Sequence, residues 1–196
     1  MSIFQAWIAP GRALVAVDTN GYKSNGGQSE MQKLAVMPLS NAVMACRGSQ
    51  LAFFQVLAQA WLVPGHNSYD KLAAGLPQLI EWAAAQFPPS LPDDAAQCEL
   101  HLVGWSDAQQ KMAGVSFTFN LKAKTAEPVG EIRRNRIGPA SNTQTPEQFD
   151  DDVAMRLARH QLAWLEENAP AEVTGGRLLV AEIRRGRIET RDVGPI

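Results

Sequence analysis

Segments that resemble strands and segments that resemble helices come in groups along this chain, and this order restricts the folds open to it. Two short runs rich in β-branched and aromatic residues, 2–9 and 12–18, flank the dipeptide Pro10-Gly11, a pattern that predicts a β-hairpin. A second apolar pair, 33–39 and 41–48, follows a loop of turn-forming residues. Strict alternation of strand and helix would indicate a parallel sheet, so the grouping favours antiparallel sheets.

The rest of the chain continues this grouped pattern. Apolar residues at helical spacing predict helices over 49–62, over 69–87 with a possible kink at Pro77, and over 145–168. Further strands are expected at 98–105, 114–121 and 129–138, and two more near the end of the chain within 176–193. We therefore predict an α+β fold.

Nearly all of the expected strands are apolar on both faces. Such strands indicate sheets that stack on each other and are covered on the outside by helices. A length of 196 residues provides one substantial core but hardly two, so residues 1–196 are expected to form a single domain.

Charge and hydropathy exclude several kinds of partner. The chain has 18 Lys and Arg against 20 Asp and Glu, which gives no electrostatic reason to expect nucleic acid or an anionic membrane. No segment reaches the roughly 18 consecutive apolar residues of a membrane span, and the first residues lack the basic and apolar regions of an export signal. We expect a cytoplasmic protein that binds neither nucleic acid nor membrane.

Cysteine and histidine give no sign of a cofactor. The two cysteines, Cys46 and Cys98, have neither metal-site spacing nor the number needed for a disulfide framework. The three histidines are far apart and lack the spacing of metal ligands. We therefore expect buried thiols, no metal and no cofactor.

Four local patterns together resemble the proteasome β-subunit family. They are the first hairpin ending in VAVD, the lysine before a strand, the AVMACRGS turn into a helix, and TGG before a late strand. The similarity includes the peptidase subunit of the bacterial heat-shock-locus protease and other bacterial proteasome homologues. It implies an αββα sandwich, an N-terminal-nucleophile hydrolase, peptide or protein substrates and a homo-oligomeric ring, and it leaves any ATPase partner unknown.

The resemblance also implies site residues. The family nucleophile is the first residue of the mature chain, and an Asp ends the second strand sixteen positions later; here these places are taken by Ser2 and Asp18. Lys33 takes the place of the basic residue of the third strand, one position short of the usual separation. Gly48 takes the place of the oxyanion-hole glycine.

The chemistry of these four residues is coherent. A serine hydroxyl needs a base, and an α-amine on the same residue can be that base because its pKa lies near neutrality. We expect removal of Met1 to free this amine. A nearby Lys33 ammonium would favour the neutral amine, Asp18 would orient Lys33, and the Gly48 N–H would stabilise an oxyanion.

Three further family positions are matched less closely. Alignment on Gly175-Gly176 places Thr174 where the family has a supporting serine, but it places Ala171 where the family has an aspartate. Ser141 loosely matches a further accessory serine. Each site residue also has a purely structural interpretation: a second residue suited to Met removal, a turn-initiating Asp, a solvated Lys and a helix-start Gly.

Three functions therefore stay open at the level of sequence. The first is a peptidase that uses Ser2. The second is an assembly subunit that kept the fold and lost the activity, which Ala171 favours. The third is an amidase of small molecules, and no residue distinguishes it from the peptidase.

Overall fold

The computed structural model describes residues 2–22, 28–62, 65–88, 90, 96–139, 147–169 and 175–196. In these ranges the chain forms two five-stranded sheets, a separate two-stranded pair and three α-helices. All hydrogen-bonded neighbour strands in the described ranges are antiparallel. The expected mixture of helices with largely antiparallel sheets is therefore confirmed.

The first sheet joins the two ends of the chain. Its strands, in spatial order, are β10 (Asn135–Gly138), β1 (Phe4–Ala9), β2 (Arg12–Asp18), β11 (Arg177–Arg184) and β12 (Arg187–Pro195). The second sheet consists of β5 (Leu34–Met37), β6 (Ala42–Arg47), β7 (Gln97–Ser106), β8 (Lys111–Asn120) and β9 (Thr125–Glu131). The two-stranded pair is β3 (Asn20–Tyr22) with β4 (Gln28–Glu30).

The helices are α1 (Gln50–Leu62), α2 (Tyr69–Ala85) and α4 (Asp151–Asn168), and a short 3-10 turn, η1 (Pro38–Ser40), joins β5 to β6. Helix α2 continues through Pro77. Helix α4 begins later than the sequence pattern predicted, because extended Asp150 caps it by accepting a hydrogen bond from the Val153 N–H at 2.8 Å.

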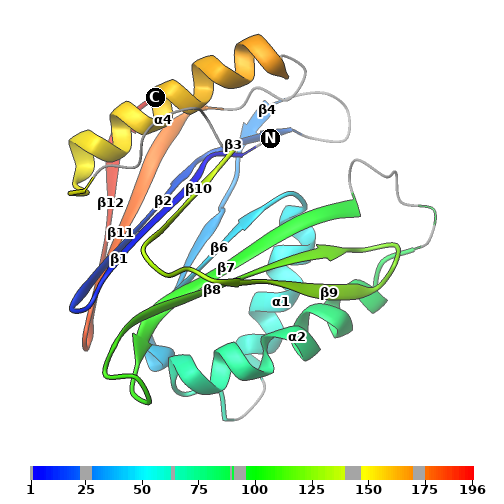
Figure 1. The fold of residues 1–196 in the computed structure, drawn as a ribbon. Helices are drawn as coiled ribbons and strands as arrows, with labels where there is room; N and C mark the ends of the chain where they lie inside the picture. Colours follow the sequence, from blue (N-terminus) through cyan, green and yellow to red (C-terminus); the bar gives the residue numbers. More distant parts are fainter. Residues whose placement is uncertain are drawn as a thin grey trace.

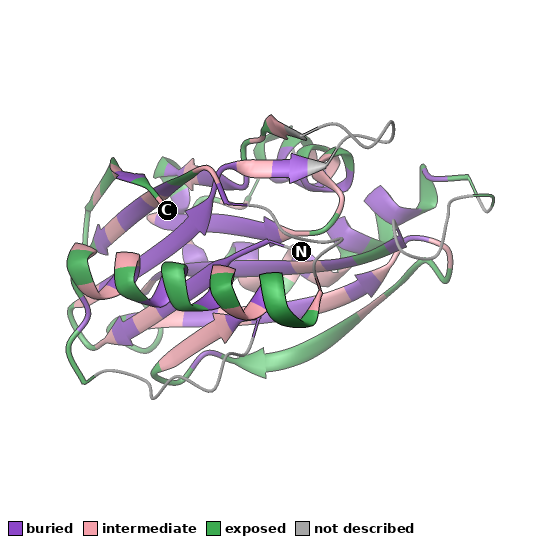
Figure 2. Cartoon of the chain, turned by 90° about the horizontal axis from the view of Figure 1, so that it is seen from above, coloured by how far each residue is buried: buried purple, intermediate pink, exposed green. Residues whose placement is uncertain are grey.

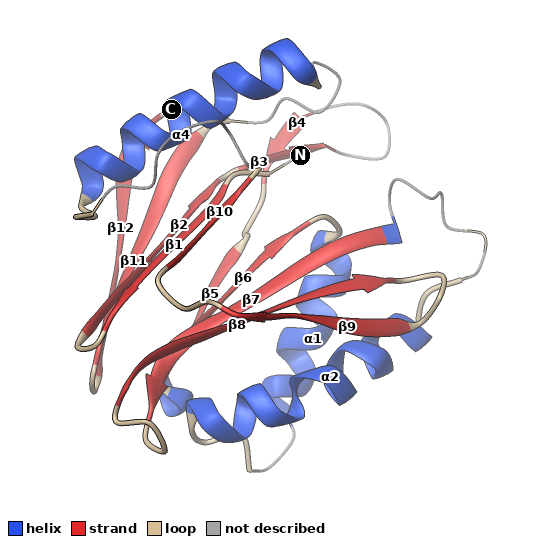
Figure 3. Ribbon diagram, viewed as in Figure 1, coloured by secondary structure: helices blue, strands red, loops and turns tan. Residues whose placement is uncertain are grey.

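The two large sheets face each other, with α4 outside the first sheet and with α1 and α2 outside the second (Figures 1 and 3). One group of buried apolar residues lies between the sheets and includes Phe4, Val15 and Val103. A second group joins α1 and α2 to the second sheet, and a third joins α4 to the first sheet. Figure 2 shows buried strands beneath α4, whose outward side is exposed. Apolar residues on both faces of the strands account for this stacking.

The strand expected at 129–138 does not form as one element. Its first part belongs to β9 and pairs with β8 in the second sheet, while β10 pairs with β1 in the first sheet. Between them, Ile132 donates its N–H to the Gly114 carbonyl, and the Arg134 carbonyl accepts from the Ile8 N–H. The segment thus crosses from one sheet to the other, which its apolar pattern could not indicate.

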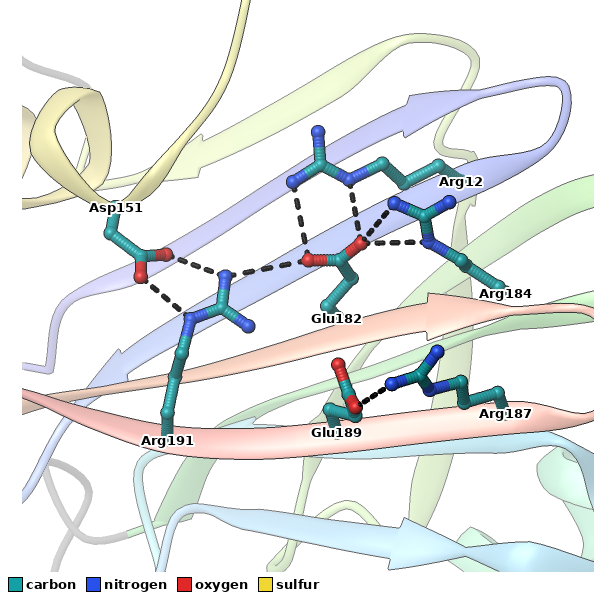
Figure 4. Close-up of polar contacts among 7 residues, drawn as sticks. All are labelled: Arg12, Asp151, Glu182, Arg184, Arg187, Glu189 and Arg191. Atoms are coloured by element: carbon teal, nitrogen blue, oxygen red, sulfur yellow. Dashed lines mark hydrogen bonds and ion pairs between the residues drawn. The ribbon is translucent and has the colours of Figure 1, made fainter.

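Charged side chains cover the part of the first sheet next to the start of α4 (Figure 4). Glu182 on β11 accepts hydrogen bonds from Arg12 on β2, at 3.0 and 3.2 Å, and from Arg184 at 2.9 Å. Arg191 on β12 donates two hydrogen bonds of 2.6 Å to Asp151, the first residue of α4. This network ties the helix start to three strands. No helix in the described ranges is both long enough and apolar enough to cross a membrane.

Candidate functional site

The first hairpin places the start of β1 beside the end of β2. The two-residue turn at Pro10-Gly11 sets the register, in which Phe4 pairs with Val17. Continuing that register by one residue brings Ile3 opposite Asp18. Ser2 therefore lies next to the end of β2, and only 9% of its surface is exposed.

Asp18 is fully buried and accepts hydrogen bonds from three parts of the chain. Its Oδ1 accepts from the Ile3 N–H at 2.8 Å. Its Oδ2 accepts from Lys33 Nζ at 2.8 Å and from the Gly175 N–H at 3.4 Å. Asp18 thus connects the start of β1, the residue before β5 and the segment leading into β11, and this is incompatible with the simple role of a turn initiator.

Lys33 is 4% exposed and forms a buried ion pair with Asp18. Its ammonium also donates to the Asn20 carbonyl, and its own carbonyl accepts from the Cys46 N–H at 3.0 Å. Burial lowers the pKa of Lys33, and the Asp18 charge opposes this effect only in part. Lys33 is therefore a buried cation that releases its proton more readily than a solvated lysine, and the interpretation as a solvated strand entry is wrong.

Gly48 lies between β6 and α1 in a conformation that favours glycine. Its φ is +100°, and a Cβ there would lie 2.5 Å from the Gln97 carbonyl oxygen. None of the hydrogen bonds among the described residues uses the Gly48 N–H. The residue before it, Arg47, donates from Nε to the Ser2 carbonyl at 2.8 Å, so the Gly48 backbone lies within the reach of one arginine side chain from Ser2.

The structure contains a polar cluster between the sheets that the sequence did not predict. Glu99 on β7 accepts from Arg47 Nη1 at 3.0 Å, and its Oε2 lies 3.4 Å from His101 Nε2. The His101 ring stacks on Phe4 with a centroid distance of 3.7 Å, and its Nδ1 lies 2.8 Å from Ser116 Oγ. Burial lowers the pKa of His101 to about 4, so the ring is neutral at pH 7.

Two sequence signals could have pointed to this cluster. Arg47 is the one charged residue in the buried strand β6, and it directly precedes Gly48. Glu99 and His101 are two positions apart and therefore share one face of β7. The contact with His101 and the hydrogen bond from Arg47 lower the pKa of the Glu99 carboxyl to about 2, although burial opposes them.

The two other expected site residues, Ser141 and Thr174, lie outside the described residues, as does Ala171. The structure therefore brings together Ser2, Asp18 and Lys33, and connects Gly48 to them through Arg47. The described residues contain no group of His, Cys, Asp or Glu side chains suited to a metal ion. What the site offers chemically is a buried lysine and carboxylate pair beside a serine.

Comparisons of sequence find no match: neither a family model nor a curated protein corresponds to this chain. Comparisons of structure find several solved relatives of the fold. Anbu, described as an ancestral β-subunit, from Yersinia bercovieri aligns over 99% of this chain and 87% of its own, with a TM-score of 0.69 and 12% identity. The helical assembly of the Anbu complex from Pseudomonas aeruginosa gives the same coverage, a TM-score of 0.68 and 13% identity.

A third solved structure, Anbu from Hyphomicrobium sp. strain MC1, covers 99% of this chain and 88% of its own, with a TM-score of 0.65 and 8% identity. Identities this low establish the fold and not the activity. The likeness confirms the resemblance to proteasome subunits at the level of the fold, and the three neighbours named here are Anbu proteins. The chain therefore has the proteasome-like fold of Anbu.

Proposed function

We propose that this chain is a proteasome-like N-terminal-nucleophile hydrolase that cleaves peptide or amide bonds with Ser2, once removal of the preceding residue frees the Ser2 amine. The observation that carries the proposal is the buried Asp18 carboxylate. It accepts hydrogen bonds of 2.8 Å from both Lys33 Nζ and the Ile3 N–H. A fold that only needed stability would gain little from a buried ion pair here, because desolvation offsets most of the attraction.

In this mechanism the Ser2 amine takes the hydroxyl proton as Ser2 Oγ attacks the substrate carbonyl. The Lys33 charge favours the neutral amine and the developing alkoxide, and Asp18 orients Lys33. The Gly48 N–H donates no hydrogen bond to a described residue, so it can donate one to the oxyanion. The amine then returns its proton to the leaving group, and water releases the acyl group from Ser2.

Thr174 and Ser141 complete the proposal as supports of the terminal amine. The support for these roles is the family resemblance, in which Thr174 and Ser141 take the places of accessory serines. Ala171 removes the carboxylate that the family resemblance implies, so Lys33 and Asp18 would provide most of the electrostatic support. We further propose that the fold forms the four-layer αββα sandwich of that family in a cytoplasmic protein.

Covalent labelling tests the proposal. The purified protein is incubated with a peptide vinyl sulfone, and intact-mass and fragment spectra identify its N-terminus and any adduct. We expect an adduct on Ser2 in a chain that starts at Ser2, retention of the adduct in Ser2→Cys, and loss of it in Ser2→Ala. A retained Met1 in protein from the native host, or an unlabelled Ser2 with a free amine, would exclude the mechanism.

The labelling experiment separates the other two functions when it is combined with hydrolysis assays on peptides and small amides. An inactive assembly subunit would show no adduct and no hydrolysis, and Ser2→Ala would change nothing. A small-molecule amidase would carry the Ser2 adduct but hydrolyse small amides and leave peptides intact.

We also infer that the chain binds copies of itself through α1, as part of a homo-oligomeric assembly for which the resemblance implies a ring. Helix α1 has no charged residue, whereas α4 carries charges along its outward side. The exposed apolar residues of this surface, with their exposed fractions, are Leu39 (84%), Leu51 (60%), Phe54 (40%), Trp61 (62%) and Leu62 (73%). The Anbu complex from Pseudomonas aeruginosa forms a helical assembly, which supports self-association of this fold.

Area and charge both favour a second copy on this α1 surface. Its apolar area is on the order of 600 Å², close to the roughly 800 Å² that each partner contributes to a standard interface. An uncharged surface meets its own copy without like-charge repulsion. Sedimentation velocity tests the inference: Leu62→Glu should dissociate the assembly, and Ala163→Glu on the opposite helix α4 should not. A monomeric wild-type protein at micromolar concentration would refute it.

A further inference from the structure

The peptide group between Ser2 and Ile3 is held on both of its edges by charged side chains. On one edge the Ile3 N–H donates to Asp18 Oδ1 at 2.8 Å. On the other edge the Ser2 carbonyl accepts from Arg47 Nε at 2.8 Å. Asp18 belongs to the first sheet and Arg47 to the second, so the start of β1 is fixed by both sheets at once.

The Arg47 guanidinium is itself fixed by its surroundings. The Arg47 side chain is 11% exposed. Its Nη1 donates to Glu99 Oε1 at 3.0 Å, and its Nε donates to the Ser2 carbonyl. Glu99 is held in turn by Arg136, whose Nη2 lies 3.8 Å from Oε2. Gly138 on β10 gives the guanidinium room, because a Cβ there would lie 2.7 Å from Nη1.

We propose that Arg47 is a positioning residue that fixes Ser2 by its carbonyl, with Glu99 setting the direction of the guanidinium. The inference rests on the proposed function of Ser2. A guanidinium suits this task because its rigid fork donates in two directions at once, whereas a lysine ammonium at the end of a flexible chain does not define both.

Fixing Ser2 matters for its proposed chemistry. A nucleophile displaced by about 1 Å can lose roughly a hundredfold in rate, because the reacting atoms no longer meet in the right geometry. Arg47 holds the Ser2 carbonyl itself, whereas Asp18 and the pairing of β1 with β2 and β10 act on the residues that follow Ser2. Loss of Arg47 should therefore slow the chemical step and leave substrate affinity nearly unchanged.

The test compares Arg47→Met with Arg191→Met. Both variants remove one arginine that donates to a carboxylate. Arg191, however, bonds Asp151 at the start of α4, whereas Arg47 bonds Glu99 and the Ser2 carbonyl. Hydrogen–deuterium exchange of the segment 2–9 measures the order of the start of β1. We expect the Ile3 amide to exchange roughly tenfold faster in Arg47→Met and at the wild-type rate in Arg191→Met.

Two further variants and one kinetic measurement complete the test. Glu99→Gln should show a smaller acceleration of exchange, and Arg47→Lys should not restore the wild-type rate; Arg47→Lys also serves if Arg47→Met fails to fold. If the wild-type protein is active, kcat of Arg47→Met should be at least tenfold below the wild-type value, with little change in KM. Wild-type exchange at Ile3 in both Arg47 variants would overturn the proposal. Faster exchange in a protein without Ser2 reactivity would instead overturn only the proposed hydrolase function.

Discussion

Replacing Asp18 with Asn is expected to destabilise the protein strongly through Lys33. Asparagine has the same shape and keeps an oxygen for the Ile3 N–H, so the main loss is the negative charge 2.8 Å from Lys33 Nζ. Asp18 is 0% and Lys33 4% exposed, so water cannot replace the lost partner. The variant thus isolates the charge pair from the backbone contacts around it.

The magnitude follows from the burial of the pair. Removing one partner of a buried ion pair typically lowers the free energy of unfolding by about 3–5 kcal/mol. This loss has an upper limit because Lys33 can release its proton instead of staying charged without a partner. For an amine with an ordinary pKa, deprotonation at pH 7 costs about 5 kcal/mol. We therefore expect a loss of about 3–5 kcal/mol at pH 7.

The sign of the pH dependence follows from the direction of the Lys33 pKa. Burial lowers the pKa of Lys33 in the folded state, and loss of the Asp18 charge lowers it further. Between this lowered pKa and the ordinary value of the unfolded chain, the unfolded state binds more protons, so stability rises with pH. The deficit of Asp18→Asn should therefore shrink as the pH rises from 7 to 10.

Urea unfolding followed by tryptophan fluorescence measures these values, with Lys33→Met and the double variant as controls. The double variant should be more stable than the sum of the two single losses implies, by about 2 kcal/mol or more, because it leaves no unpaired charge. A loss below about 1 kcal/mol in Asp18→Asn, or strictly additive effects, would refute the reasoning that the pair is buried and mutually dependent.

Three further outcomes are expected. Gly48→Ala should lower the free energy of unfolding by about 2–4 kcal/mol in urea titrations, because φ is +100° and the added Cβ would lie 2.5 Å from the Gln97 carbonyl oxygen. Burial lowers the pKa of His101 to about 4, so stability should fall by about 3 kcal/mol as the pH drops from 6.5 to 4, and His101→Gln should flatten this acid limb. Burial raises the pKa of the Cys98 thiol to about 11, so iodoacetamide at pH 8 should label Cys98 only after unfolding.

Much of the site's backbone could be predicted from the sequence. The apolar runs on either side of Pro10-Gly11 specify a hairpin, and its two-residue turn brings Ile3 opposite Asp18. The helical periods of α1 and α2 and the grouping of strands indicated the antiparallel architecture. These features depend on contacts between residues close in sequence, so local patterns suffice to find them.

Contacts between the two sheets could not be predicted from the sequence. The Arg47 bond to Ser2, the Glu99 and His101 cluster and the division of 129–138 between β9 and β10 depend on how the sheets stack. Such contacts join residues far apart in the chain, and a residue's type and spacing do not specify which distant strand it will face.

The sequence by itself determined most of the strands, the helices and the hairpin that puts Ser2 beside Asp18, because turn geometry and apolar periodicity are local. Only the tertiary structure decided that Lys33 loses its solvent and pairs with Asp18, and that Arg47 reaches across from the other sheet to the Ser2 carbonyl. Burial is a property of the packed molecule, and it turns an ordinary lysine and aspartate into a candidate catalytic pair.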